Sequence, residues 1–129
     1  MLIRTTDFVI EPDQYRFKVN ILCQPSMNSF TVLKIFYHTN WLGRGNSVYY
    51  KRKNETIWKL MGERSPQKPQ GFMPLTKPLE MDLDFELVSR CVFDTTSLKE
   101  PLTKGFVENI IISNTITSYF NYLLIQVHL

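Results

Sequence analysis

Apolar residues dominate the stretch between Phe30 and His38. Read at every second position, this stretch gives two rows, and both are rich in β-branched and aromatic side chains. The pattern predicts a strand that is buried on much of both faces. Similar alternation predicts strands over residues 7–11, 15–23 and 85–93, with a turn at residues 11–14 between the first two.

The middle of the chain predicts a hairpin followed by a proline-rich stretch. Residues 47–53 and 56–61 pair around a turn at Asn54-Glu55, whereas residues 63–78 contain four prolines and are expected to run extended without ladder hydrogen bonds. Residues 97–105 are expected to form a loop, and no stretch keeps a helical period for long. Short strands separated by Pro and Gly turns predict an all-β domain, either a β-sandwich or a jelly roll.

Composition limits the classes of function. With 129 residues, of which 43% are hydrophobic, the chain can bury the core of a single soluble domain. Fifteen basic residues against 12 acidic ones give a net charge of +3, which is too small to indicate a nucleic-acid partner. The first residues, 1–7, do not have the pattern of a signal peptide, so the sequence fits either a cytosolic protein or an incomplete secreted one. One sequon, Asn54-Glu55-Thr56, would accept a glycan in a secreted protein.

His38 is the main candidate for metal chemistry. Residues i and i+2 of a strand project to the same face, so a His-x-His pair would place two imidazoles beside one metal ion. Here the second position is Asn40, and an amide side chain is a poor ligand for copper or zinc. On this argument alone, His38 is more readily explained as a hydrogen-bonded structural residue than as a ligand.

Three motifs carry a resemblance to a known family. They are the His-Thr-x-x-Leu-Gly turn at residues 38–43, the Pro-Gln-x-Pro-Gln-x-Phe-x-Pro run at residues 66–74, and Arg-Cys-Val-Phe at residues 90–93. In this order and spacing they resemble the carboxy-terminal copper domain of the peptidylglycine α-hydroxylating monooxygenases, within the copper type II, ascorbate-dependent monooxygenases. The resemblance covers residues 7–105, as one β-sandwich domain, and leaves residues 106–129 as an unmatched tail.

The resemblance implies a fold and a chemistry. It implies an antiparallel, jelly-roll-like β-sandwich that would here be incomplete at its C-terminal end. In this family such a domain binds copper through two histidines and a methionine, and hydroxylates the α-carbon of the C-terminal glycine of a peptide. A separate N-terminal copper domain, missing from this sequence, passes electrons from ascorbate. The family also implies the secretory pathway or the extracellular space and a glycine-extended peptide as substrate.

The metal ligands of the family are matched only in part by this sequence. His38 matches the first histidine ligand, but Asn40 occupies the position of the second, and Trp41 follows where the family usually has another histidine. The methionine ligand is expected about twenty residues after Cys91, where ungapped counting reaches Ile112. The chain has no methionine after Met81.

The substrate-binding residues transfer no better. Phe36 stands where the resemblance implies an arginine that binds the substrate. Asn114 falls where the family has an asparagine that contacts the peptide, but its neighbours do not match, so coincidence explains it better than function.

The two cysteines, Cys23 and Cys91, would be paired with each other by a simple count. The resemblance instead implies two different disulfides, one with a partner near Ser113 and the other with a partner further downstream. Both cysteines would then be unpaired, and each missing cross-link would remove about 2 to 4 kcal/mol of stability.

The tail after Gly105 differs sharply from the family. It is rich in Ile, Asn, Ser, Thr and Tyr and contains no Lys or Arg. Three interpretations remain: a diverged pair of strands, a membrane segment, or translated non-coding sequence. The polar residues Asn109, Asn114, Asn121 and Gln126 interrupt the apolar run and weaken the membrane interpretation.

Two functions follow from these observations. The chain is either a fragment of a copper- and ascorbate-dependent peptidylglycine monooxygenase, inactive when isolated, or a non-catalytic β-sandwich module that has lost the copper site. The first is favoured as the family to which the chain belongs, and inactivity is favoured for this polypeptide alone.

Overall fold

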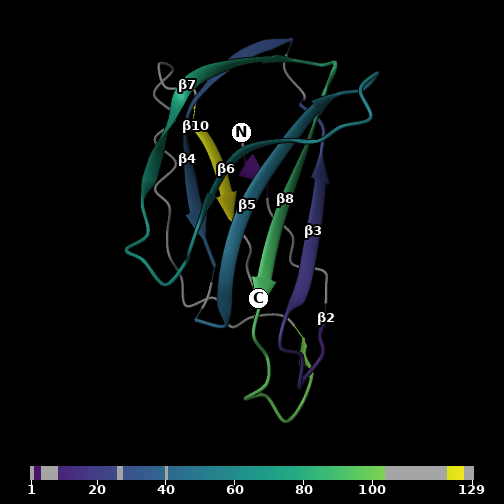
Figure 1. Cartoon of the computed structure of the whole chain (residues 1–129), viewed down its shortest axis with the longest axis vertical. Helices are drawn as coiled ribbons and strands as arrows, with labels where there is room; N and C mark the ends of the chain where they lie inside the picture. The colour runs from purple at the N-terminus through teal and green to yellow at the C-terminus, as the bar shows by residue number, and fades with distance from the viewer. Residues whose placement is uncertain (1, 4–8, 26–27, 40, 104–121, 127–129) are drawn as a thin grey trace.

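The computed structural model describes residues 2–3, 9–25, 28–39, 41–103 and 122–126. These residues form strands joined by turns and loops (Figure 1). The strands are β1 (Leu2–Ile3), β2 (Val9–Ile10), β3 (Phe17–Cys23), β4 (Ser29–His38), β5 (Gly43–Arg52), β6 (Lys59–Arg64), β7 (Phe72–Asp82), β8 (Phe85–Phe93), β9 (Leu102–Thr103) and β10 (Tyr122–Gln126).

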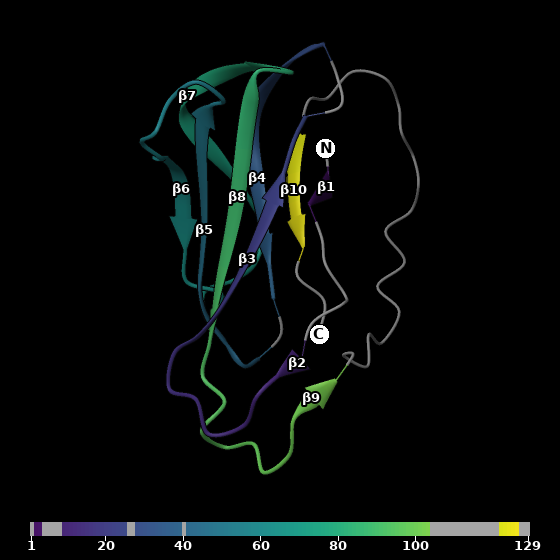
Figure 2. The same ribbon diagram turned by 90° about the vertical axis from the view of Figure 1, so that its right-hand side faces the viewer.

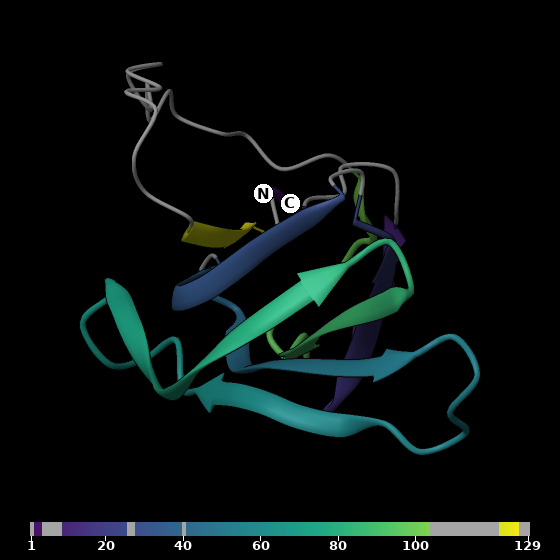
Figure 3. The same ribbon diagram turned by 90° about the horizontal axis from the view of Figure 1, so that it is seen from above.

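Two four-stranded sheets form the body of the domain. One has the strand order β3-β8-β5-β6 and the other β1-β10-β4-β7, while β2 and β9 form a separate two-stranded ladder. Figure 2 and Figure 3 show β4 and β10 in one layer and β5 and β6 in the other. The predicted all-β sandwich is therefore confirmed. One difference is that β10 pairs in parallel with both β1 and β4, whereas the other pairings are antiparallel.

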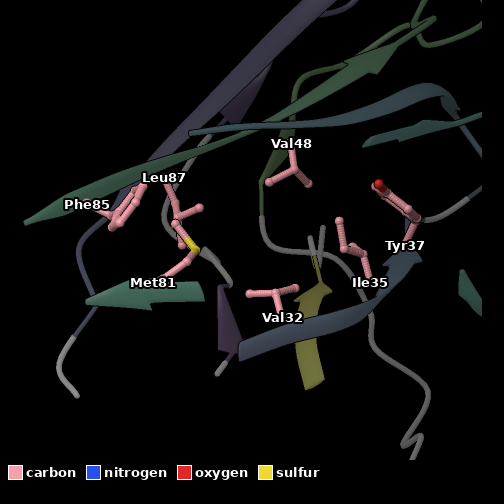
Figure 4. Packing of buried hydrophobic residues seen from close by; sticks show 7 residues of the cluster. All are labelled: Val32, Ile35, Tyr37, Val48, Met81, Phe85 and Leu87. Carbon is pink, nitrogen blue, oxygen red and sulfur yellow. The ribbon is translucent and has the colours of Figure 1, made fainter. Parts of the chain in front are cut away.

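The main hydrophobic core lies between the two sheets and draws on both of them (Figure 4). Burial of these apolar side chains is the principal driving force that holds the layers together. The buried members are Val32, Ile35, Tyr37, Val48, Met81, Phe85 and Leu87.

A second buried cluster ties the turn after β4 to the other sheet. Leu42 is 1% exposed and packs with Ile10, Cys91 and Phe93. Its carbonyl also accepts a hydrogen bond from the backbone N–H of Asp94, at 2.9 Å. The turn that follows His38 is therefore anchored by buried contacts.

Strand β4 departs from the predicted alternation. Val32 and Ile35 are both buried, while Leu33 and Lys34 between them are both exposed. The ladder with β7 shifts its register at the same place, between Val32 and Lys34. An irregularity of this kind reverses which residues face the core, so the two predicted rows are interrupted at mid-strand.

The expectation that residues 63–78 form no ladder is wrong. Strand β7 begins at Phe72 and pairs with β4, with Pro74 opposite Lys34. Because β7 is at the end of its sheet in the strand order, a proline can be accommodated there without removing a hydrogen bond from a central ladder.

The remaining predictions fare unevenly. The hairpin is confirmed, with Tyr50 opposite Lys59, although its second strand begins at Lys59 and continues to Arg64. Strand β9 lies within the predicted loop at residues 97–105 and pairs with β2. Within the tail, residues 122–126 form β10, and residues 106–121 lie outside the described part of the chain. The described residues contain no helix long and apolar enough to cross a membrane.

Candidate metal centre around His38

His38 is the last residue of β4 and shares the outward row of that strand with Lys34 and Phe36. The row alternates with the buried Ile35 and Tyr37, which face the core between the sheets. The imidazole therefore lies on the side of the sheet away from the hydrophobic core. It is partly buried at this position.

Gln70, which precedes β7, holds the imidazole of His38. The amide oxygen Oε1 of Gln70 contacts His38 Nδ1, and its amide nitrogen Nε2 donates to the backbone carbonyl of Thr39 at 3.1 Å. Because the amide oxygen can only accept, Nδ1 carries the hydrogen in this arrangement. In the neutral ring the lone pair is then on Nε2, the arrangement that second-shell partners impose on metal-binding histidines.

Three further hydrogen bonds fix the turn after His38. Arg44 Nη1 donates to the carbonyls of Trp41 and Gly43, at 2.9 and 3.1 Å. Gln67 Nε2 donates to the same Gly43 carbonyl at 2.6 Å. Both Gln67 and Gln70 come from the proline-rich segment, so this segment positions the end of β4.

An aromatic ring lies close to His38 on its face of the sheet. The ring of Phe36 stacks near His38, with centroids 6.3 Å apart and an angle of 23° between the planes. The centroid of the Phe72 ring in β7 is 5.1 Å from that of Phe36. These side chains give the face an apolar character and bring no metal donor.

The described residues do not complete a copper site. Copper that cycles through the cuprous state prefers imidazole and thioether ligands. Met73 of β7 is the methionine nearest in the ladder, but it lies opposite Ile35, packs against the core and accepts a hydrogen bond from Arg64 Nη1 at 2.6 Å. Met81 is also buried in the core. No group of three His, Cys, Asp or Glu side chains suited to a metal occurs in the described part of the chain.

Comparison with known protein families identifies the family of this chain. The family model of the copper type II ascorbate-dependent monooxygenase C-terminal domain matches residues 1–126. The chain belongs to this family. The match extends beyond Gly105, and the predicted domain boundary there stays a prediction.

Curated relatives in the monooxygenase family are much longer than this chain. Peptidylglycine alpha-amidating monooxygenase of Rattus norvegicus is 35% identical over 92 residues, which is 71% of this chain and 9% of that protein. The corresponding enzyme of Mus musculus is 34% identical over 92 residues, which again is 71% of this chain and 9% of that protein. Enzyme A of Xenopus laevis is 32% identical over 95 residues, 71% of this chain and 10% of that protein. The chain thus spans about a tenth of the length of these relatives.

The predicted site residues of this family member are only partly brought together. The structure places His38 and Phe36 side by side on one face of β4. Trp41, which follows Asn40, is 68% exposed at the turn. Asn40, Ile112, Ser113 and Asn114 lie outside the described residues, so their predicted roles stay predictions.

The two cysteines lie on neighbouring strands but are out of register. Cys91 is opposite Val19, and Cys23 is opposite Leu87, four pairs further along the same ladder. At about 3.3 Å per residue this separation is too long for a disulfide, and both thiols are free. Burial raises the pKa of Cys91 to about 12 and also raises the pKa of Cys23.

Gln70 is the site residue that sequence reasoning did not identify. It is 32 positions from His38, and nothing in the local pattern of either segment predicts their contact. The one available signal was the Pro-Gln-x-Pro-Gln run itself, which carried the family resemblance but had no role assigned to it.

Proposed function

We propose that this chain retains the scaffold of a peptidylglycine-hydroxylating copper domain and that the isolated polypeptide has no hydroxylase activity. In the relatives of this family, copper and ascorbate would be the metal and the reductant, and a glycine-extended peptide would be the substrate. The same relationship supports the secretory pathway as the compartment. For the 129 residues themselves, the proposal is a domain that no longer performs the oxidation.

One observation carries this proposal. The outward row of β4 offers the imidazole of His38 together with Phe36, Phe72 and Gln70, while Met73 and Met81 belong to the opposite, core-facing side. Gln70 orients the ring as a ligand's partner would. The described residues therefore provide an orienting partner for the ring but no thioether on the face of His38.

The copper-binding part of the proposal can be tested by titrating Cu(I) into the purified chain against a competing chelator. We expect no tight stoichiometric site. His38→Ala and His128→Ala, which change the two histidines of the chain, are matched variants that should behave like the parent. Tight binding by the parent chain would contradict the proposal, and its loss in one variant would identify the histidine responsible.

The catalytic part can be tested by supplying a glycine-extended peptide with copper, ascorbate and dioxygen. We expect no hydroxylated product, either from the parent chain or from the variant Asn40→His. Restoring one imidazole does not supply the sulfur donor, so one substitution is expected to be insufficient. Turnover by either protein above a no-enzyme control would contradict the proposal.

A further inference from the structure

A cavity of about 550 Å³ lies against β5, β6 and the start of the segment that joins β6 to β7. It is separate from the face that carries His38, because its strand residues Asn46 and Met73 point between the sheets. The residues of the cavity that matter here are Arg44, Asn46, Glu63, Arg64, Lys68 and Met73.

Asn46 is the unusual residue of this cavity. This residue is only 3% exposed, yet neither its side-chain Oδ1 nor its Nδ2 has a hydrogen-bond partner. Arg64 is directly opposite Asn46 in the β5–β6 ladder, and its Nε is likewise buried without a partner. Buried polar atoms in native proteins are nearly always paired, so three unpaired atoms on two facing residues call for a partner, which is either a water molecule or a ligand.

The charges around the cavity favour an anion. Arg44, Arg64 and Lys68 contribute three cations, and Glu63 is the acidic residue among the lining side chains. Arg44 shares part of its charge with Asp94, at 3.7 Å. Arg64 already directs Nη1 to Met73 Sδ and Nη2 to the carbonyl of Pro69, which fixes the plane of its guanidinium. Its Nε–H is one of the three donors that these bonds leave over, and the one that is buried without a partner.

We propose that this cavity binds a small oxyanion that also carries a hydroxyl group. The oxyanion accepts hydrogen bonds from Arg64 Nε and Asn46 Nδ2, while the hydroxyl donates to Asn46 Oδ1. Hydrogen phosphate and hydroxycarboxylates share this chemistry. A simple carboxylate would leave Oδ1 unpaired and would therefore bind with one hydrogen bond fewer.

The size of the cavity agrees with an organic ligand. A water molecule occupies about 30 Å³ of liquid volume, so one bridging water would satisfy the three atoms but fill little of the space. Ligand pockets in proteins commonly hold about 300 to 1,000 Å³. The cavity therefore accommodates a hydroxy acid or a phosphate together with its hydration.

The experiment is an NMR titration of the full, ¹⁵N-labelled chain with three probes: glycolate, inorganic phosphate and acetate. Ionic strength is held constant with sodium chloride. We expect the Asn46 side-chain amide and the Arg64 Nε–H signals to shift saturably with glycolate or phosphate. Glycolate should bind about five-fold more tightly than acetate, because it adds one hydrogen bond. Saturation by phosphate alone would identify a phosphate site, and by glycolate alone a hydroxy-acid site.

Variants separate binding from folding. Asn46→Leu keeps a similar volume, removes the unpaired amide, and should abolish the saturable shift at Arg64 without lowering the midpoint of thermal unfolding. Lys68→Gln should weaken binding several-fold. Lys18→Gln, which removes the same charge from an exposed position on β3, is the matched control and should leave the affinity unchanged.

Several results would overturn the proposal. Shifts that do not saturate, or that sodium chloride alone reproduces, would show that there is no site. If Asn46→Leu bound glycolate or phosphate as tightly as the parent chain, Asn46 would not be part of the site. Acetate binding as tightly as glycolate would contradict the role given to Oδ1. None of these readouts depends on copper, so the proposed loss of hydroxylase function stands or fails separately.

Discussion

Strands β8 and β4 are both inner strands of their sheets, but they differ in how regularly they alternate. In β8 every second residue from Phe85 to Phe93 is buried, without interruption. In β4 the buried positions change phase between Val32 and Ile35. Both strands contribute to the core, but the shift in β4 places Phe36 and His38 on the outside and keeps Ile35 and Tyr37 inside.

This difference shows how one strand can serve two purposes. An irregularity in a ladder redirects side chains without ending the strand, and such features are frequent near functional sites. Past the shift, β4 contributes both to the core and to the face that carries His38. In a strand as regular as β8, the same row of side chains faces the core along the whole length of the strand.

The largest expected effect comes from the core of the regular strand. Leu87 in β8 is fully buried, so Leu87→Ala should lower the free energy of unfolding by about 3 kcal/mol, through lost burial and a cavity. The matched variant is Leu33→Ala at the shift in β4, where the side chain is 39% exposed and the loss should stay below about 0.5 kcal/mol. Denaturant titration measures both. Equal losses would mean that the two strands do not differ in this way.

A second substitution tests how closely the two sheets approach. A Cβ added at Gly62 in β6 would collide with the hydroxyl of Tyr37 in β4. Gly62→Ala should therefore lower the free energy of unfolding by about 1 to 3 kcal/mol. Adding Tyr37→Phe removes the hydroxyl and should restore part of the loss.

Gly71→Ala is the control for this substitution, because a Cβ at Gly71 meets no atom within 4 Å. Its effect should be close to zero. If Tyr37→Phe gives no relief to Gly62→Ala in the double variant, the collision with Tyr37 is not the cause of the loss.

The reactivity of the two cysteines allows a comparison of β8, which contains Cys91, with the end of β3, where Cys23 lies. Cys91 is 1% exposed, so it should react far more slowly with a thiol reagent than Cys23, which is only partly buried. Mass spectrometry after a short exposure should find the label on Cys23. Labelling of Cys91 at the same rate would contradict its burial in the native state.

The raised pKa of Cys91 also gives a dependence on pH. Folding favours the protonated thiol, so its contribution is fully present below the unfolded pKa of about 9 and is lost as the pH rises toward about 12. Between these values the parent chain should lose more stability than Cys91→Ala. Parallel loss in both proteins would rule out this thiol as the source.

The smallest effect is expected on the outer face of the β5–β8 ladder. Lys51 Nζ lies 2.6 Å from Glu86 Oε2, and this contact is the main cause of the lowered pKa of Glu86. The pair's contribution should be present above the usual pKa of a glutamate and disappear as the pH falls through the lowered value. Glu86→Gln should therefore be slightly less stable than the parent at pH 7 and equal to it in strong acid, as measured by urea unfolding.

Sequence alone predicted the regular half of the molecule well. The bounds predicted for the strand at residues 85–93 are those observed, because a period of two directly reports which side chains are buried. The hairpin between β5 and β6 followed from the same signal. The phase change in β4 was not predictable, since it depends on pairing with β7, a strand that the prolines had argued against.

The candidate site shows the same limit. The pattern and the family motifs led to His38, but the contact with Gln70 joins residues 32 positions apart and arises only when the segment before β7 folds back over the end of β4. Nothing in the sequence pattern indicated a role for Asn46. Its importance comes from being opposite Arg64 with its amide unpaired, and both facts belong to the assembled sheet.

The pairing of β10 with β4 has a consequence for handling this protein. The ladder runs from Lys34 opposite Tyr122 to His38 opposite Gln126, so a chain shortened before Tyr122 would leave the backbone groups of β4 without their partner. An open strand edge next to Phe36 invites a second molecule to add itself there. Truncated preparations would then form soluble oligomers or precipitate, and a sedimentation profile would reveal this before any assay of function.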